Sequence, residues 1–130
     1  MANRQEQFVH PYDTVVSAGL RFISELIAWV SGPWAMALMS GWLAVPAVII
    51  LVMLPAVFST PNDKRHVVVA TPGPVRLLIE AFLFVTACIA PWFVWPQVWA
   101  LAAVVVVISG ILAGRSRIAW LLKGASAAPV

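Results

Sequence analysis

The sequence predicts an all-α integral membrane protein, a four-transmembrane-helix bundle built as two helical hairpins. Of the 130 residues, 62% are hydrophobic and only 10% are charged, whereas soluble domains average about 25% charged residues. Charge is also confined in space, because the stretches from Leu26 to Asn62 and from Ala81 to Gly114 contain no Lys, Arg, Asp or Glu. One spanning helix needs about 20 apolar residues. Each uncharged block, with the turn before it, is therefore long enough for two helices joined by a tight turn.

We expect a single integral membrane domain over residues 1–130, with four spans at about residues 18–39, 42–59, 74–95 and 97–114. A polar N-terminal tail (1–13) precedes the spans, and an interfacial basic segment (115–124) and a loose tail (125–130) follow them. Membrane strands alternate apolar and polar residues, but the runs 47–54 and 104–108 are continuously apolar. Helices are therefore favoured over a β-barrel.

The basic residues predict the orientation. With four spans, all eight Lys and Arg residues fall on one side: Arg4, Arg21, Lys64, Arg65, Arg76, Arg115, Arg117 and Lys123. The positive-inside rule then predicts a bacterial inner-membrane protein with both termini in the cytoplasm. This bias also explains the net charge of +3, so no nucleic-acid partner is expected. The expected partners are the bilayer and the anionic lipids of its cytoplasmic leaflet. In that leaflet, the segment 115–124 is predicted to contact lipid through Arg115, Arg117, Trp120 and Lys123.

Six of the seven tryptophans flank the two turns expected on the outer side. Tryptophan prefers the membrane interface, where its ring is half buried and its N–H can reach water. An outer interface belt is therefore predicted, consisting of Trp29, Trp34, Trp42, Trp92, Trp95 and Trp99. A binding site for an aromatic or lipid-like ligand is the alternative.

An Arg-x-x-x-Glu pattern opens each half of the chain, with Arg21 before Glu25 and Arg76 before Glu80. Residues four apart share a helix face, so each Arg can contact its own Glu, or the pairs can be exchanged between the halves. Unpaired charge is costly in a membrane, so all four side chains are expected inside the bundle, in its cytoplasmic third. One hypothesis is a buried ion-pair lock that fixes helix packing. The other is a proton or cation site at Glu25 and Glu80. An Arg one turn away favours the lock.

The shared spacing, together with the pairs Pro33-Trp34 and Pro91-Trp92, indicates an internal repeat. A two-helix unit returns to its starting side, so two such units would form a parallel 2+2 repeat about the membrane normal. Small residues are expected to permit close helix packing. These are Ala28, Gly32, Gly110 and Gly114.

No motif for catalysis or metal binding is present. His10, His66 and Cys88 are the only residues of their types, and no phosphate loop, nucleophile elbow or HExxH occurs. We therefore expect no enzyme, no catalytic residue, no metal and no cofactor. The favoured function is a structural or accessory membrane subunit, with a membrane protein or a second copy as its partner. The alternative is a small proton-coupled transporter that uses Glu25 and Glu80.

Two motifs, Leu20-Arg21-Phe22-x-x-Glu25-Leu26 and Arg76-Leu77-x-x-Glu80-x-x-x-Phe84, resemble the YrdB-like family of uncharacterised small four-span bacterial membrane proteins. The stretch from Pro55 to Pro61 fits as well, and the resemblance covers about residues 19–114. It implies the architecture and carries no biochemical activity. The polar N-terminus and the basic C-terminal segment depart from the family pattern, which suggests partner- or lipid-binding additions.

Overall fold

The computed structural model describes residues 12–60 and 68–124. The expected loose tail 125–130, most of the polar tail 1–13, and Lys64 and Arg65 lie outside the described residues.

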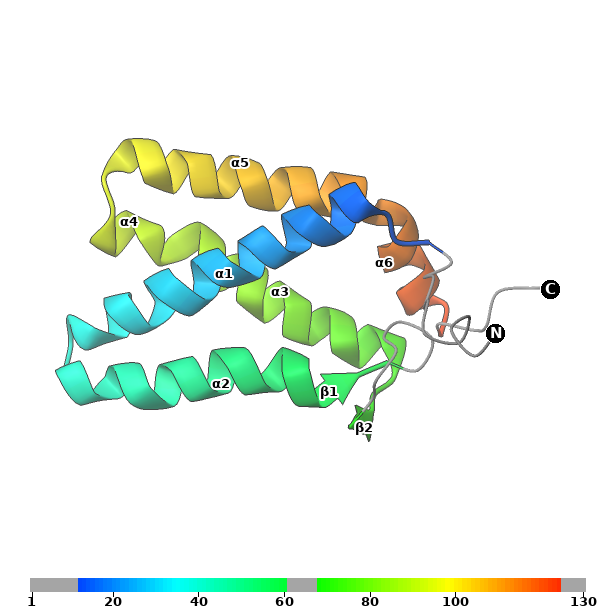
Figure 1. Ribbon diagram of the computed structural model, residues 1–130, viewed down its shortest axis with the longest axis horizontal. Helices are drawn as coiled ribbons and strands as arrows, with labels where there is room; N and C mark the ends of the chain where they lie inside the picture. Colours follow the sequence, from blue (N-terminus) through cyan, green and yellow to red (C-terminus); the bar gives the residue numbers. More distant parts are fainter. Residues whose placement is uncertain (1–11, 61–67, 125–130) are drawn as a thin grey trace, which may run out of the picture.

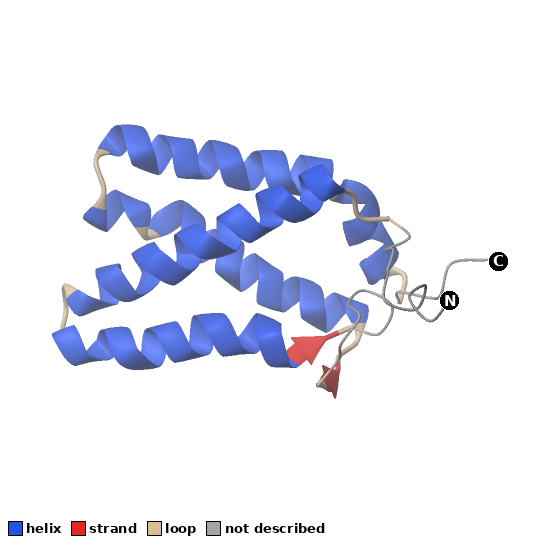
Figure 2. Ribbon diagram, viewed as in Figure 1, coloured by secondary structure: helices blue, strands red, loops and turns tan. Residues whose placement is uncertain are grey.

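The described chain is mostly helical (Figure 2). Its helices are α1 (Val15–Ala37), the 3-10 helix η2 (Gly41–Leu43), α2 (Ala44–Val57), α3 (Gly73–Ile89), α4 (Pro91–Val94), α5 (Gln97–Ala113) and α6 (Arg115–Leu122). Two short strands, β1 (Phe58–Ser59) and β2 (Val69–Ala70), pair in parallel. The second span expected from the sequence includes residues 58–59, but Phe58 is extended and pairs with Val69. Helix α2 therefore ends at Val57.

The connections between the long helices divide the molecule into two ends (Figure 1). Helix α1 leads to α2 through η2, and α3 leads to α5 through α4, with both connections at one end, here called the connection end. The sheet, α6 and the first turns of α1 and α3 gather at the opposite end, here called the charged end. Helix α1 crosses the bundle diagonally and packs against α2, α3 and α5.

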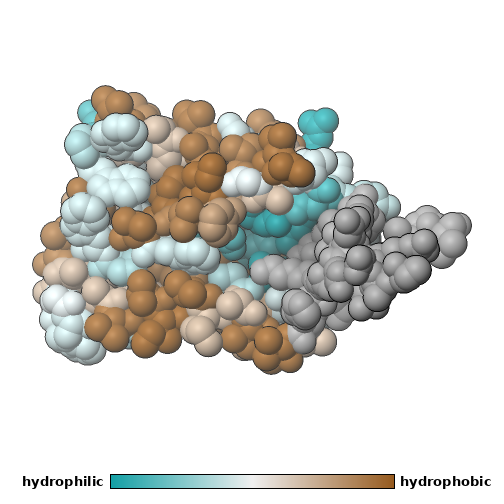
Figure 3. Space-filling model, viewed as in Figure 1, coloured by the Kyte–Doolittle hydropathy of each residue, from teal (hydrophilic) through white to brown (hydrophobic). Residues whose placement is uncertain are grey.

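Two helical segments are long and apolar enough to cross a membrane, namely Val15–Ala37 and Gly73–Val94, which joins α3 and α4. Helices α5 and α6 are bent by 61° relative to each other, and together they could form a third, broken span. The segment Gly41–Val57 is apolar but shorter. Large apolar side chains are exposed along all the long helices, and hydrophobic residues cover much of the visible surface (Figure 3). Such an exterior is typical of a protein whose solvent is lipid.

Small residues on its buried face let α1 occupy the centre of the bundle. That face consists of Ser17, Ser24, Glu25, Ala28, Ser31, Gly32 and Pro33. The hydroxyls of Ser24 and Ser31 donate to the carbonyls of Leu20 and Ile27, at 2.9 and 2.6 Å. The serines therefore satisfy their own hydrogen bonds within α1 and leave its buried face free to pack.

Trp29 joins α1 to α2 at a proline. Pro55 has no N–H, so the carbonyl of Leu51, one turn earlier in α2, lacks its helical partner. The indole Nε1 of Trp29 donates to that carbonyl at 2.9 Å, and its ring packs against a core that includes Ala28 and Leu83. The N–H of Trp29 is therefore used inside the bundle, and its place in an interface belt stays a prediction.

The first residue of α3, Gly73, lies against the end of α6. A Cβ atom at Gly73 would lie 1.9 Å from the carbonyl oxygen of Leu121. The N-terminus of α3 thus meets the C-terminal turn of α6, where the opposite partial charges of the two helix ends attract each other. Trp120 and Leu121 of α6 are buried there and pack against Leu77 of α3. This contact fixes α6 across the charged end.

The close approach at Gly73 predicts that Gly73→Ala lowers the free energy of unfolding by about 3 kcal/mol or more, because the methyl group must displace the backbone of α6. Gly19→Ala is the matched control, since nothing lies within 4 Å of a Cβ at Gly19. Thermal unfolding in detergent measures both variants. Limited trypsin digestion should also show faster cleavage within α6 for Gly73→Ala alone. Equal stability of the two variants would contradict the contact.

The bond at Pro55 predicts a specific coupling. Trp29→Phe should cost about 1 kcal/mol, because the carbonyl of Leu51 loses its donor. In a Pro55→Ala background the cost should be smaller, since the alanine introduced there supplies the missing backbone N–H. A double-mutant cycle by thermal unfolding measures this coupling, and strictly additive effects would contradict it.

Candidate functional site

The strongest polar cluster of the described chain is centred on Glu80. Arg76 donates from Nε to Glu80 Oε2 at 2.9 Å, one helical turn away on α3. Arg117 of α6 donates from Nη1 to Oε1 at 2.9 Å and from Nη2 to Oε2 at 2.6 Å. Both carboxylate oxygens therefore accept hydrogen bonds from guanidinium groups. All three residues are at most 2% exposed.

Arg76 also closes the end of α2. Its Nη1 donates to the carbonyls of Pro55 and Phe58 at 2.8 and 2.7 Å. The last carbonyls of a helix have no partner within the helix and carry partial negative charge, so a buried arginine satisfies them and stabilises that end. Arg76 thus ties the last turn of α2 to α3.

Arg117 and Trp120 are not where the sequence analysis expects them. Both are predicted to contact lipid, but Arg117 is 2% exposed and Trp120 is 6% exposed. The reason is the 61° bend between α5 and α6, which directs one face of α6 onto α3. Arg117 forms a two-pronged contact with Glu80, and the ring of Trp120 lies against Tyr12, with 5.8 Å between ring centroids. The other two predicted lipid contacts, Arg115 and Lys123, are exposed.

Arg21 pairs with a residue that the sequence analysis leaves in the polar tail. Its Nη2 lies 2.9 Å from Asp13 Oδ2. Asp13 also accepts from the hydroxyl of Ser17. Thr14 and Ser17 cap the start of α1 reciprocally: Ser17 N donates to Thr14 Oγ1 at 3.1 Å, and Thr14 N donates to Ser17 Oγ at 3.0 Å. The pattern Asp-Thr-x-x-Ser at residues 13–17 is a capping signal that was readable in the sequence.

The charge of Asp13 is stabilised by this arrangement. Burial raises the pKa of the Asp13 carboxyl, but hydrogen bonds from Arg21 and Ser17, with the positive charges of Arg21 and Arg117, outweigh burial and hold the pKa below its ordinary value of 3.8. Glu25, the other acid of the Arg-x-x-x-Glu pattern, is buried on α1 and also has an interaction partner.

Among the described residues, a small void adjoins these charges. A void of about 10 Å³ is lined by Arg21, Glu80, Arg117, Gly110 and Gly114, among other residues. One water molecule needs about 10–15 Å³ of such space. The void therefore accommodates at most one water and no larger substrate.

The predicted packing residues lie at helix contacts. Ala28 and Gly32 are on the buried face of α1, and a Cβ at Gly32 would lie 2.7 Å from Leu51 Cδ1. Gly110 faces α1, where a Cβ would lie 3.4 Å from Leu20 Cβ. Gly114 is buried at the bend before α6.

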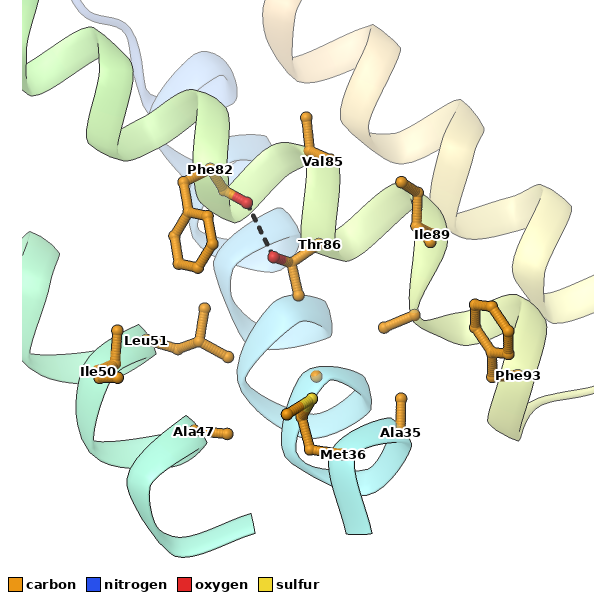
Figure 4. Close-up of a pocket in the computed structure, with 12 residues that line it drawn as sticks. Ala35, Met36, Ala47, Ile50, Leu51, Phe82, Val85, Thr86, Ile89 and Phe93 are labelled. Atoms are coloured by element: carbon orange, nitrogen blue, oxygen red, sulfur yellow. Dashed lines mark hydrogen bonds between the residues drawn. The ribbon is translucent and has the colours of Figure 1, made fainter. Parts of the chain in front are cut away.

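An apolar groove of about 410 Å³ lies on the other half of the molecule (Figure 4). It is lined by residues of α1, α2, α3 and α4, with Gly32, Ala35 and Met36 contributed by α1. The hydroxyl of Thr86, which also lines the groove, donates to the carbonyl of Phe82 at 2.8 Å within its own helix. The groove thus offers shape and apolar contact without free polar chemistry.

The other predicted belt tryptophans lie around the connection end, in or beside α1, η2, α4 and α5. Trp34, Trp42, Trp92 and Trp99 are exposed, and Trp95 is half-buried. Their role at a membrane interface remains a prediction.

Within 12–60 and 68–124, no group of three His, Cys, Asp or Glu side chains could hold a metal ion. The charged end holds the ion pairs of Arg21 with Asp13 and of Arg76 and Arg117 with Glu80.

Comparisons with known proteins give a single result. The family model described as a protein of unknown function (DUF2568) matches residues 19–108. No curated protein and no solved structure matches the chain. The match indicates an uncharacterised family, and the YrdB-like name rests on the resemblance alone.

The Asp13 contacts predict a pH-dependent stability. Because the folded pKa of Asp13 lies below its ordinary value of 3.8, its contribution is complete above that value and is lost as the pH falls through the folded pKa. Wild type should exceed Asp13→Asn in melting temperature by a constant margin between about pH 5 and pH 7, and the margin should shrink below about pH 4. Melting curves from about pH 7 to pH 3 measure it, and a margin that grows on acidification would contradict the ion pair.

Proposed function

This chain belongs to the DUF2568 family of proteins of unknown function, and we propose that it serves as a non-enzymatic structural or accessory subunit of the bacterial inner membrane. In this proposal the long helices cross the bilayer as two hairpins. The charged end and both termini lie in the cytoplasm, and the tryptophans of the connection end lie at the outer interface. The single observation that carries the proposal is the Glu80 carboxylate, held by two arginines from two helices.

Helix lengths support four crossings. Val15–Ala37 and Gly73–Val94 are long enough by themselves. Helix α5 has 17 residues and is about 25 Å long at about 1.5 Å per residue. A bilayer accommodates a deficit of a few Å by local thinning. The segment Gly41–Val57 is similarly apolar, so the same adjustment applies to it.

The contacts of Glu80 favour a lock over a transport site. A proton or cation site needs an oxygen that can bind the ion and a path that lets it leave. Both Glu80 oxygens already accept hydrogen bonds from Arg76 or Arg117, and the adjoining void holds at most one water. Loading Glu80 with an ion would break contacts that join α3 to α6. Removing one partner of a buried ion pair lowers the free energy of unfolding far more than the intact pair raises it.

An accessory role also suits the exterior. The described surface presents apolar side chains over its helices and an apolar groove of about 410 Å³ near the connection end. Such features suit contact with lipid or with another membrane helix more than they suit chemistry on a polar substrate. We propose a membrane protein partner or a second copy as the neighbour.

The lock predicts that Glu80→Gln lowers the free energy of unfolding by about 3–5 kcal/mol, because Arg76 and Arg117 remain buried without their shared carboxylate. Thermal unfolding and size-exclusion chromatography of the purified protein in detergent measure the loss. The double variant Glu80→Leu/Arg117→Met should recover part of it, since both charges leave together.

Two further variants make this test specific. Arg115→Gln removes an exposed arginine two residues from Arg117 and should change stability by less than about 0.5 kcal/mol. Glu25→Gln, alone and with Glu80→Gln, measures the coupling between the two acids. If Glu80→Gln keeps wild-type stability and abolishes a proton flux into liposomes, the lock is wrong and the transporter hypothesis replaces it.

A further inference from the structure

The charged groups of the described chain divide into a balanced buried set and two outliers. The buried or half-buried set contains three acids and three arginines: Asp13, Glu25, Glu80, Arg21, Arg76 and Arg117. Its formal charges cancel. Within residues 12–60 and 68–124, the charges outside this set are Arg115 and Lys123, both exposed and both on or directly after α6. Within the described chain, excess positive charge is thus concentrated on α6 and the residue that follows it.

Helix α6 separates its residues into two faces. Arg117, Trp120 and Leu121 are buried at the i, i+3, i+4 spacing of one helical face. Arg115, Ala119, Leu122 and Lys123 lie on the other face and are exposed. Leu122 is 61% exposed. The outer face therefore carries a basic residue at each end and an apolar patch between them, which is typical of a helix lying in a membrane interface.

The position of α6 suits this orientation. Its axis is bent by 61° from that of α5, and it lies across the charged end of the bundle (Figure 1). Its buried face is fixed by the Glu80 contacts and by the backbone approach at Gly73. Arg115 and Lys123 are about 12 Å apart along the helix at about 1.5 Å per residue, so they can reach separate head groups.

We propose that the outer face of α6 binds anionic phospholipid head groups, with Arg115 and Lys123 pairing with lipid phosphates and Leu122 inserting among the acyl chains. Charge complementarity favours this occupant, because the face is basic and apolar at once and a bilayer surface is acidic and apolar at once. The inference rests on the membrane location proposed above, but it does not depend on the ion-pair lock.

Native mass spectrometry of the detergent-purified full chain tests the proposal, with phosphatidylglycerol or phosphatidylcholine of the same acyl chains added. The wild-type protein should retain phosphatidylglycerol more strongly than phosphatidylcholine. The double variant Arg115→Gln/Lys123→Gln should lose about 5-fold in affinity for each charge, or about 25-fold in total. Its affinity for phosphatidylcholine and its melting temperature should stay at the wild-type values. Added salt should weaken the phosphatidylglycerol interaction alone.

The double variant Lys64→Gln/Arg65→Gln is a control matched in net charge. It should keep most of the phosphatidylglycerol affinity. If this control loses as much phosphatidylglycerol affinity as the α6 variant, lipid binding depends on net charge alone and the assignment to α6 is wrong. Unchanged phosphatidylglycerol binding by the α6 variant would also overturn the proposal. An acidic protein segment would then replace lipid as the ligand of this face. A lowered melting temperature of Glu80→Gln with intact lipid binding would separate the lock from the lipid surface.

Discussion

The carboxylate of Glu80 is the constraint on which the charged end of the bundle depends. A buried carboxylate is tolerable only if hydrogen bonds and opposite charge replace the water it has lost. Arg76 and Arg117 supply both. Arg76 simultaneously satisfies two carbonyls at the end of α2. The contacts of Glu80 and Arg76 therefore join α2, α3 and α6.

The centre of the bundle follows a different principle. Helix α1 contacts α2, α3 and α5 because most residues of its buried face are serine, alanine or glycine, which let backbones approach closely. The hydroxyls of Ser24 and Ser31 on that face donate to carbonyls within α1 itself. Where Pro55 frees a carbonyl in α2, Trp29 of α1 reaches across to bind it. Close packing of α1 thus leaves the polar groups at these contacts hydrogen-bonded.

Local sequence signals predict local structure here, and long-range partners escape them. The long uncharged runs indicate apolar helices, because a bilayer permits little else. The four-residue spacing of Arg76 and Glu80 predicts a contact on one helix face, and their nearest charged atoms are 2.9 Å apart. Arg117 lies 37 residues from Glu80. Only the bend after α5 therefore decides whether the Arg117 side chain contacts lipid or the Glu80 carboxylate. Arg21 occupies the matching position of the first half, yet it pairs with Asp13.

The order in which the chain is made gives the Arg117 contact a second meaning. Among the described helices, α6 is synthesised after α1, α3 and α5, so Glu80 exists before its partner Arg117. Until then, the assembling protein contains a carboxylate with only part of its neutralising charge. Docking of α6 ends that condition and closes the bundle. The hydrogen bonding of the Glu80 carboxylate is therefore complete only when α6 has packed against α3.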